Sequence, residues 1–148
     1  MTKLDTYFTA LQRAGLRLTA PRRLICEYLA QSAQHPTPLH VYTDLLARDP
    51  ELSRATVYNT LNILQSLGVI VELSFGSDHT HYDTDASPHV NLICLRCHKI
   101  VDYPHLIPVA ELNAAVEHST GFVAITGRLD LLGLCSACYQ DTQKESIK

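Results

Sequence analysis

The segment Tyr82–Tyr103 reads YDTDASPHVNLICLRCHKIVDY, and the rest of the chain is organised around it. It contains one Cys-x-x-Cys pair, Cys94 and Cys97, and several carboxylate, imidazole and amide side chains that can also bind metals. It lies where a helical, mildly basic first half meets an acidic second half with strand-like patterns. The segment therefore predicts a metal-binding region at the boundary between two structural units.

A second pair, Cys135-x-x-Cys138, lies near the end of the chain. Four thiolates match the tetrahedral, sulfur-rich coordination of structural zinc, which leaves no open position for chemistry. A thiol redox motif is the alternative explanation, but two pairs that each follow a strand-like run favour zinc. We predict that Zn²⁺ fastens the first turn to the C-terminal part of the chain and stabilises this small unit.

Composition restricts the class of protein. The chain has 148 residues, 46% of them hydrophobic, which suits one ordinary domain or two small ones. No apolar run approaches the roughly 20 residues of a membrane span, and the N-terminus lacks a signal-peptide pattern. We therefore expect a cytoplasmic protein with no membrane partner, in which persistent disulfides are rare.

The formal net charge of −3 hides an asymmetry between the halves. Residues 1–70 carry seven Lys/Arg and five Asp/Glu, a net +2, whereas the rest carries five and ten, a net −5, with six of the eight histidines. The first half could face phosphate and the second could hold cations, although ordinary surface charge explains a +2 equally well.

Residues 1–83 predict a winged helix-turn-helix domain. Apolar residues recur at helical spacing in four segments, and Thr19, Thr37 and Ser53 are suitable N-caps. We expect helices over 3–14, from Thr19, from Thr37, and between Ser53 and Gly68, then strands over 69–73 and 79–83 as the wing. A generic small helical domain is the alternative. Cys26 lies alone among apolar neighbours and is expected to fill the core.

Residues 84–88 are a candidate linker to a second domain at 89–148. This domain is expected to contain strands over 90–93 and 99–102, a helix from Val109 to near Gly121, and a long strand over 122–134. The last ten residues are polar and expected to fray. Because this small α/β unit has an apolar strand in need of a partner, we predict a homodimer and, overall, an α+β chain.

A second constellation contains two imidazoles, two carboxylates and an amide. Such a mostly oxygen and nitrogen set suits Fe(II) or Mn(II) better than structural zinc, and an ion bound by it would fix the angle between the domains. Each member also has an ordinary explanation, as a turn histidine before proline or a solvated acid. The candidate ligands are His35, Asp83, His89, Asn91 and Asp102.

The chain resembles the ferric uptake regulator family, and most closely its peroxide-sensing repressor branch, over nearly its full length. The matching stretches are GLRLTAPR at 15–22, HPTPLHVY at 35–42, LSRATVYNTL at 52–61, HVNLICLRCHKIVDY at 89–103, TGF at 120–122 and GLCSAC at 133–138. The resemblance implies a dimeric repressor that binds an inverted-repeat operator when its regulatory metal is present. In the peroxide-sensing branch, that metal is Fe(II) or Mn(II), and peroxide oxidises ligand histidines and releases the DNA.

The resemblance assigns the same five regulatory ligands and the four paired cysteines for zinc. Asp102 is typical of the peroxide-sensing branch, where iron-uptake regulators tend to have Glu. Asn91 departs from the family pattern, since most relatives have His at that position. Either its amide oxygen serves as a harder, weaker ligand, or His79 or His81 completes the shell, although both are more easily explained as wing residues.

The resemblance also assigns Tyr58 and Asn59 to base reading on the fourth helix. A Tyr ring can pack on thymine methyls and Asn can pair with adenine, which suits an AT-rich operator. Arg54, Thr56 and Arg17 are better placed for phosphate or the minor groove.

Three functions follow as hypotheses. The first is a metal-dependent repressor that responds to peroxide, and the second is a related repressor that senses iron, manganese or zinc without peroxide chemistry. The third is a small thiol oxidoreductase, against which the sequence shows no nucleophile–base pairing. We therefore predict a DNA-binding regulator and not an enzyme.

Overall fold

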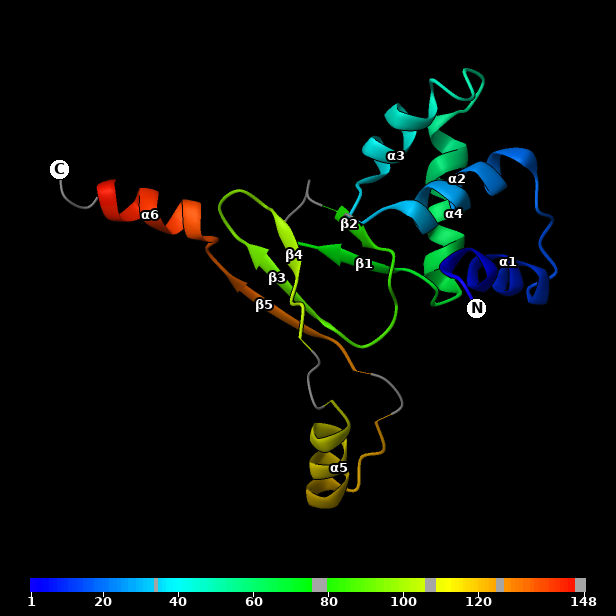
Figure 1. Ribbon diagram of the computed structural model, residues 1–148. Coiled ribbons are helices and arrows are strands. Elements are labelled where there is room, and N and C mark those ends of the chain that lie inside the picture. Colours follow the sequence, from blue (N-terminus) through cyan, green and yellow to red (C-terminus); the bar gives the residue numbers. More distant parts are fainter. Residues whose placement is uncertain (34, 76–79, 106–108, 125–126, 146–148) are drawn as a thin grey trace. The chain divides into compact units, whose positions relative to one another are not determined.

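The chain forms two compact units, Met1–Ala86 and Ser87–Lys148, in a computed structural model (Figure 1). The model describes residues 1–33, 35–75, 80–105, 109–124 and 127–145. The division between the units falls inside the predicted linker at 84–88. Among the described residues, no helix combines the length and apolar character that crossing a bilayer requires.

The first unit contains four helices followed by a two-stranded hairpin. Its elements are α1 (Lys3–Arg13), α2 (Ala20–Gln31), α3 (Pro38–Leu45), α4 (Arg54–Ser66), β1 (Val71–Ser74) and β2 (Thr80–Asp83). The hydroxyls of Thr37 and Ser53 each accept a hydrogen bond from a backbone N–H in the first turn of α3 and α4, as expected of N-caps. Thr19 occupies the N-cap position of α2 without such a bond, and Pro21 lies in the first turn.

The four helices share one core. Their apolar stripes converge, and Val57, Leu61 and Leu64 of α4 are fully buried, which leaves the opposite face of α4 in solvent. Cys26 is also fully buried, and burial raises its pKa to about 12. The prediction that Cys26 fills the core is therefore confirmed.

The hairpin after α4 is the expected wing. β1 and β2 pair antiparallel, from Val71 opposite Asp83 to Ser74 opposite Thr80. The turn predicted at its tip falls on residues 76–79, outside the described part of the chain. Helices followed directly by a hairpin make this unit a winged helix-turn-helix.

The second unit is built on a three-stranded sheet in the order β4-β3-β5. The central strand β3 (Val90–Cys94) pairs antiparallel with β4 (Ile100–Asp102) and parallel with β5 (Leu129–Gly133). A parallel pair needs a long connection, and here that connection contains α5 (Val109–Thr120).

Two expectations for this unit are wrong over the described residues. Within the strand predicted over 122–134, Leu129–Gly133 pairs with β3, whereas Phe122 and Val123 are 66% and 65% exposed, and residues 125–126 lie outside the described part of the chain. Of the last ten residues, which were predicted to fray, 139–145 belong to α6 (Ser136–Glu145), and 146–148 are not among the described residues. Arg96 anchors this helix, since its guanidinium donates to the Cys138 carbonyl (3.3 Å) and to Glu145 (2.9 Å).

Helix α1 holds the chain where it leaves the wing. The buried Tyr7 hydroxyl donates to the carbonyl of Thr84 at 2.7 Å, and Lys3 donates to the Thr84 hydroxyl at 3.3 Å. Because Thr84 directly follows β2, these bonds fix the end of the hairpin against the helical core.

Tyr7→Phe should therefore lower the free energy of unfolding by about 1 kcal/mol, because it leaves a buried carbonyl without its donor. Urea denaturation of the zinc-loaded protein, followed by circular dichroism, measures the change. Tyr139→Phe is the matched control, since Tyr139 is 56% exposed. Equal stability of both variants would show that the Tyr7 hydroxyl contributes nothing.

Candidate metal centres

Four cysteines from distant parts of the second unit converge. Cys94 ends β3 and Cys97 lies in the following turn, whereas Cys135 follows β5 and Cys138 lies in the first turn of α6. Their sulfur atoms all lie within 4.8 Å of one another, and the Sγ atoms of Cys97 and Cys135 are 3.8 Å apart. Tetrahedral zinc with bonds of about 2.3 Å places its sulfurs roughly 3.8 Å apart. The cluster therefore fits a structural Zn²⁺ ion.

The backbone around the cluster favours a thiolate at one position. Hydrogen bonds from the backbone N–H groups of Cys97 and Cys135 lower the pKa of Cys94 to about 5. A hydrogen bond with the Cys135 thiol, together with burial, raises the pKa of Cys138 to about 12. The metal-free cluster thus retains protons at neutral pH, and zinc must displace them when it binds.

The turn between the first two cysteines closes through His98. Its backbone N–H donates to the Cys94 carbonyl at 2.9 Å, and its φ of 61° lies in the left-handed region. His98 therefore has a conformational role in the turn.

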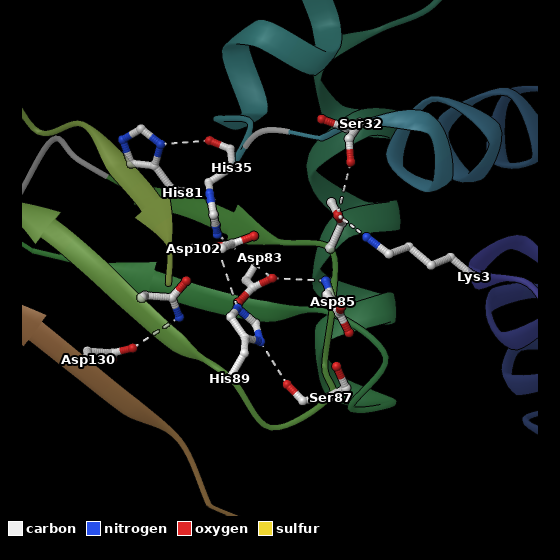
Figure 2. Close-up of polar contacts among 12 residues, drawn as sticks. Lys3, Ser32, His35, His81, Asp83, Asp85, Ser87, His89, Asp102 and Asp130 are labelled. Atoms are coloured by element: carbon white, nitrogen blue, oxygen red, sulfur yellow. Dashed lines mark hydrogen bonds and ion pairs between the residues drawn. The ribbon is translucent and has the colours of Figure 1, made fainter. Parts of the chain in front are cut away.

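In the first unit, His35 and Asp83 face each other. Nε2 of His35 lies 3.9 Å from Oδ1 of Asp83, and both side chains are nearly fully buried (Figure 2). Asp83 ends β2, and its Oδ1 accepts a hydrogen bond from the backbone N–H of Asp85 at 2.9 Å.

The wing holds the segment that carries His35. The backbone N–H of Tyr82 donates to the Pro36 carbonyl at 2.9 Å, and Nδ1 of His81 donates to the His35 carbonyl at 2.8 Å. The His81 ring also stacks on Phe75 with a centroid separation of 5.5 Å. His81 thus supports the segment that carries His35, and His79, the other candidate replacement ligand, lies outside the described residues.

In the second unit, His89 and Asp102 form a similar pair. Nε2 of His89 lies 3.6 Å from Oδ1 of Asp102, at the end of β4 (Figure 2). Nδ1 of His89 lies 2.8 Å from the carbonyl oxygen of Ser87. Because a carbonyl only accepts, Nδ1 carries the hydrogen, and a neutral ring then presents the lone pair of Nε2 to the carboxylate.

Both separations exceed a hydrogen bond. Two ligand atoms that each lie roughly 2.1 Å from one ion, at angles of about 90° to 140°, are roughly 3.0 to 3.9 Å apart. The pair in each unit therefore has the spacing of two ligands on one cation.

Asn91 is the second residue of β3 and is completely buried. Its Nδ2 donates to Oδ1 of Asp130 on β5 at 3.1 Å. Sequence reasoning missed Asp130, although a single acid between leucines in an apolar strand was an available signal.

Of the predicted DNA-contacting residues, four lie on α4 of the first unit, and Arg17 lies in the segment between α1 and α2. Tyr58 is 44% exposed, and Asn59 and Arg17 are also exposed. The Arg54 guanidinium lies over the Tyr42 ring, 5.3 Å from its centroid.

Thr56 is engaged within the cap of α4. Its backbone N–H donates to the Ser53 hydroxyl at 3.1 Å, and the two hydroxyls lie 2.8 Å apart. The predicted DNA contact by Thr56 stays a prediction.

A winged helix-turn-helix followed by a unit with a four-cysteine cluster and a His/carboxylate pair defines a metal-binding, DNA-binding regulator. A family profile described as "Ferric uptake regulator family" matches residues 13–132. The chain belongs to the ferric uptake regulator family.

Individual relatives agree with this assignment. The chain is 32% identical to the peroxide-responsive repressor PerR of Staphylococcus epidermidis over 139 residues, which cover 94% of this chain and 92% of that protein. A solved PerR from Streptococcus pyogenes, described as a basis for peroxide sensing and gene regulation, is 31% identical with a TM-score of 0.53, covering 93% and 94% of the two chains. The Helicobacter pylori ferric uptake regulator shares the fold, with a TM-score of 0.74 at 23% identity over 93% and 91%.

Family membership decides between several of the hypotheses. Proteins of this family are dimeric DNA-binding regulators and not enzymes, so the thiol oxidoreductase is excluded. The predicted α+β fold with a DNA-binding and a dimerisation domain is confirmed.

Zinc should protect four of the five thiols from alkylation. In the native zinc-loaded protein we expect iodoacetamide to add nothing, since the metal holds four thiolates and Cys26 is buried with a raised pKa. A chelator should release four reactive thiols and a denaturant the fifth, counted by intact-protein mass. Cys26→Ala is the control and should still give four adducts. Four adducts without the chelator would contradict a zinc site.

Proposed function

We propose that this protein is a metal-dependent transcriptional repressor that binds its operator with Fe(II) or Mn(II) in a regulatory site and releases it after reaction with peroxide. The observation that carries the proposal is the geometry of His89. Its Nδ1 lies 2.8 Å from the Ser87 carbonyl oxygen, which fixes the ring, and its Nε2 lies 3.6 Å from Oδ1 of Asp102. This separation is longer than a hydrogen bond and suits two ligand atoms on one cation.

The proposed ligand set combines imidazole nitrogen with carboxylate and amide oxygen. Such donors suit Fe(II) and Mn(II), whereas the thiolates of the other centre suit zinc. The proposed ligands are His35, Asp83, His89, Asn91 and Asp102. Two of these come from the first unit and three from the second, so metal occupancy would couple the DNA-binding unit to the dimerisation unit.

The chain's own residues prepare the two imidazoles. The Ser87 carbonyl fixes the ring of His89, and the hydrogen bonds from the wing hold the segment of His35. Ferrous iron held by these residues would activate peroxide, so that one peroxide oxygen enters a ligand imidazole and the other leaves as water. An imidazole that gains oxygen becomes a poorer ligand, and loss of the ligand releases the constraint on the DNA-binding units. Asp102 and the similarity to PerR proteins support peroxide chemistry over metal sensing alone.

The exposed face of α4 is the proposed reading surface. Tyr58 and Asn59 would contact base edges in an AT-rich inverted repeat, each protomer of the dimer reading one half. Arg17, Arg54 and Thr56 would contact the DNA backbone or minor groove. The exposure of Tyr58 and Asn59 on a helix whose opposite side is buried supports this proposal.

Peroxide sensing is tested with an operator enriched from random DNA by the Mn(II)-loaded protein. After low peroxide, the Fe(II)-loaded protein should lose operator binding, and peptides with His35 or His89 should gain one oxygen atom by mass spectrometry. The Mn(II)-loaded protein should keep both its mass and its binding. His89→Ala should abolish metal-dependent binding, whereas His118→Ala on α5, an exposed position, is the control.

If the iron form keeps its mass and binding, the protein senses metal alone. If His89→Ala, still folded and zinc-loaded, binds the operator in response to Mn(II) as the wild type does, the regulatory site itself is wrong.

Tyr58→Ala should weaken binding to the enriched operator by about 10- to 100-fold, the worth of one base contact, with little change on random DNA. Arg17→Ala should weaken binding to both DNAs and reduce the salt slope by about one per protomer, because it removes a phosphate contact. Fluorescence anisotropy across a salt series measures both effects. Equal losses on both DNAs for Tyr58→Ala would remove it from base reading.

A further inference from the structure

Three polar residues form a row across the sheet of the second unit. The register places Asp102 of β4 and Asp130 of β5 directly opposite Asn91 of β3, one on each side. Residues opposite each other on neighbouring strands project from the same face of a sheet. His89 precedes Asn91 by two positions and therefore shares this face. The central amide thus has one carboxylate on each flank.

Asp130 decides which end of this amide faces β5. Nδ2 of Asn91 donates to Oδ1 of Asp130 at 3.1 Å, and Asn91 is 0% exposed. A carboxylate only accepts hydrogen bonds, so a flipped amide would place two acceptors against each other in a buried position. The oxygen of Asn91 is therefore kept away from Asp130, and the other neighbour in its row is Asp102.

Arg128 holds the Asp130 carboxylate in the position from which it accepts the hydrogen bond of Asn91. Its Nη2 lies 2.8 Å from Oδ2 of Asp130, so one carboxylate oxygen pairs with the guanidinium while the other accepts from Asn91. Both oxygens are engaged within the second unit, and the positive charge of Arg128 opposes a second cation at Asp130. On the other side of Asn91, Oδ1 of Asp102 lies 3.6 Å from Nε2 of His89.

We propose that Asp130, backed by Arg128, is a positioning residue that commits Asn91 to bind the regulatory metal through its amide oxygen. This inference rests on the proposed function. It explains how the amide of Asn91 can act as a metal ligand at a position where an imidazole is expected. Without Asp130, the buried amide can present either end, and an NH₂ group repels a cation. Partners of this kind typically change metal affinity by 10- to 100-fold.

The test is a double-mutant cycle in the full-length zinc-loaded protein. Asp130→Asn keeps the size of the side chain but can either donate or accept, so it no longer selects one orientation of Asn91. We expect it to weaken Mn(II) binding by 10-fold or more, measured from the electron paramagnetic resonance of free Mn(II). In an Asn91→Ala background the same change should have no further effect. Asp141→Asn, on the exposed surface of α6, is the charge-matched control.

A second readout is independent of the metal. Before Mn(II) is added, the side-chain NH₂ signal of Asn91, assigned by its loss in Asn91→Ala, should exchange slowly with solvent in the wild type and faster in Asp130→Asn. Unchanged exchange and unchanged Mn(II) affinity in Asp130→Asn would overturn the inference. An equal loss of affinity in the Asn91→Ala background would also overturn it, because Asp130 would then act without Asn91.

The outcome separates this inference from the proposed function. If His89→Ala abolishes Mn(II) binding while Asn91→Ala and Asp130→Asn bind as the wild type does, only the positioning role fails. If His89→Ala also binds as the wild type does, the regulatory site fails.

Discussion

The register of β3 is the constraint on which both candidate metal centres depend. This strand presents Asn91 to two aspartates near its start and supplies Cys94 to the thiol cluster at its end. Because side chains alternate along a strand, a slip of one residue would turn Asn91 to the opposite face and separate Cys94 from its partners. Both candidate centres therefore depend on the same strand register.

Pairing along both sides of β3 secures this register, and further hydrogen bonds close the ends of the strand. At one end, Tyr103 donates to the Val90 carbonyl at 2.9 Å, and at the other, Leu95 donates to the Gly133 carbonyl at 2.8 Å. A unit of this size buries little apolar surface, and several leucines of β5 remain more than two-fifths exposed. Zinc bound at the thiol cluster would add a cross-link at the same end as Leu95, and it would also stabilise the strand that carries Asn91.

Features that depend on neighbouring residues were predictable from the sequence. The caps at Thr37 and Ser53, the buried stripe of α4 and the hairpin after it follow from local chemistry, and the structure confirms them. The convergence of the four paired cysteines was also predictable, because two Cys-x-x-Cys motifs in one chain are typical of a single zinc site. The regulatory ligand set stays a prediction, but the pairs His35–Asp83 and His89–Asp102 have the spacing it requires.

Features that depend on distant partners were not predictable. Arg96, in the turn between Cys94 and Cys97, bonds to Glu145 of α6, and β5 pairs with the five residues of β3. Asn91 is the clearest case. From the sequence alone, Asn91 is either a weak metal ligand or a substitution that removes a ligand. Which of the two holds depends on whether the oxygen or the NH₂ group of its amide faces the metal. That orientation is set by Asp130, whose own charge is held by Arg128. Whether position 91 still supplies a metal ligand is therefore decided together with β5, the neighbouring strand that carries Asp130.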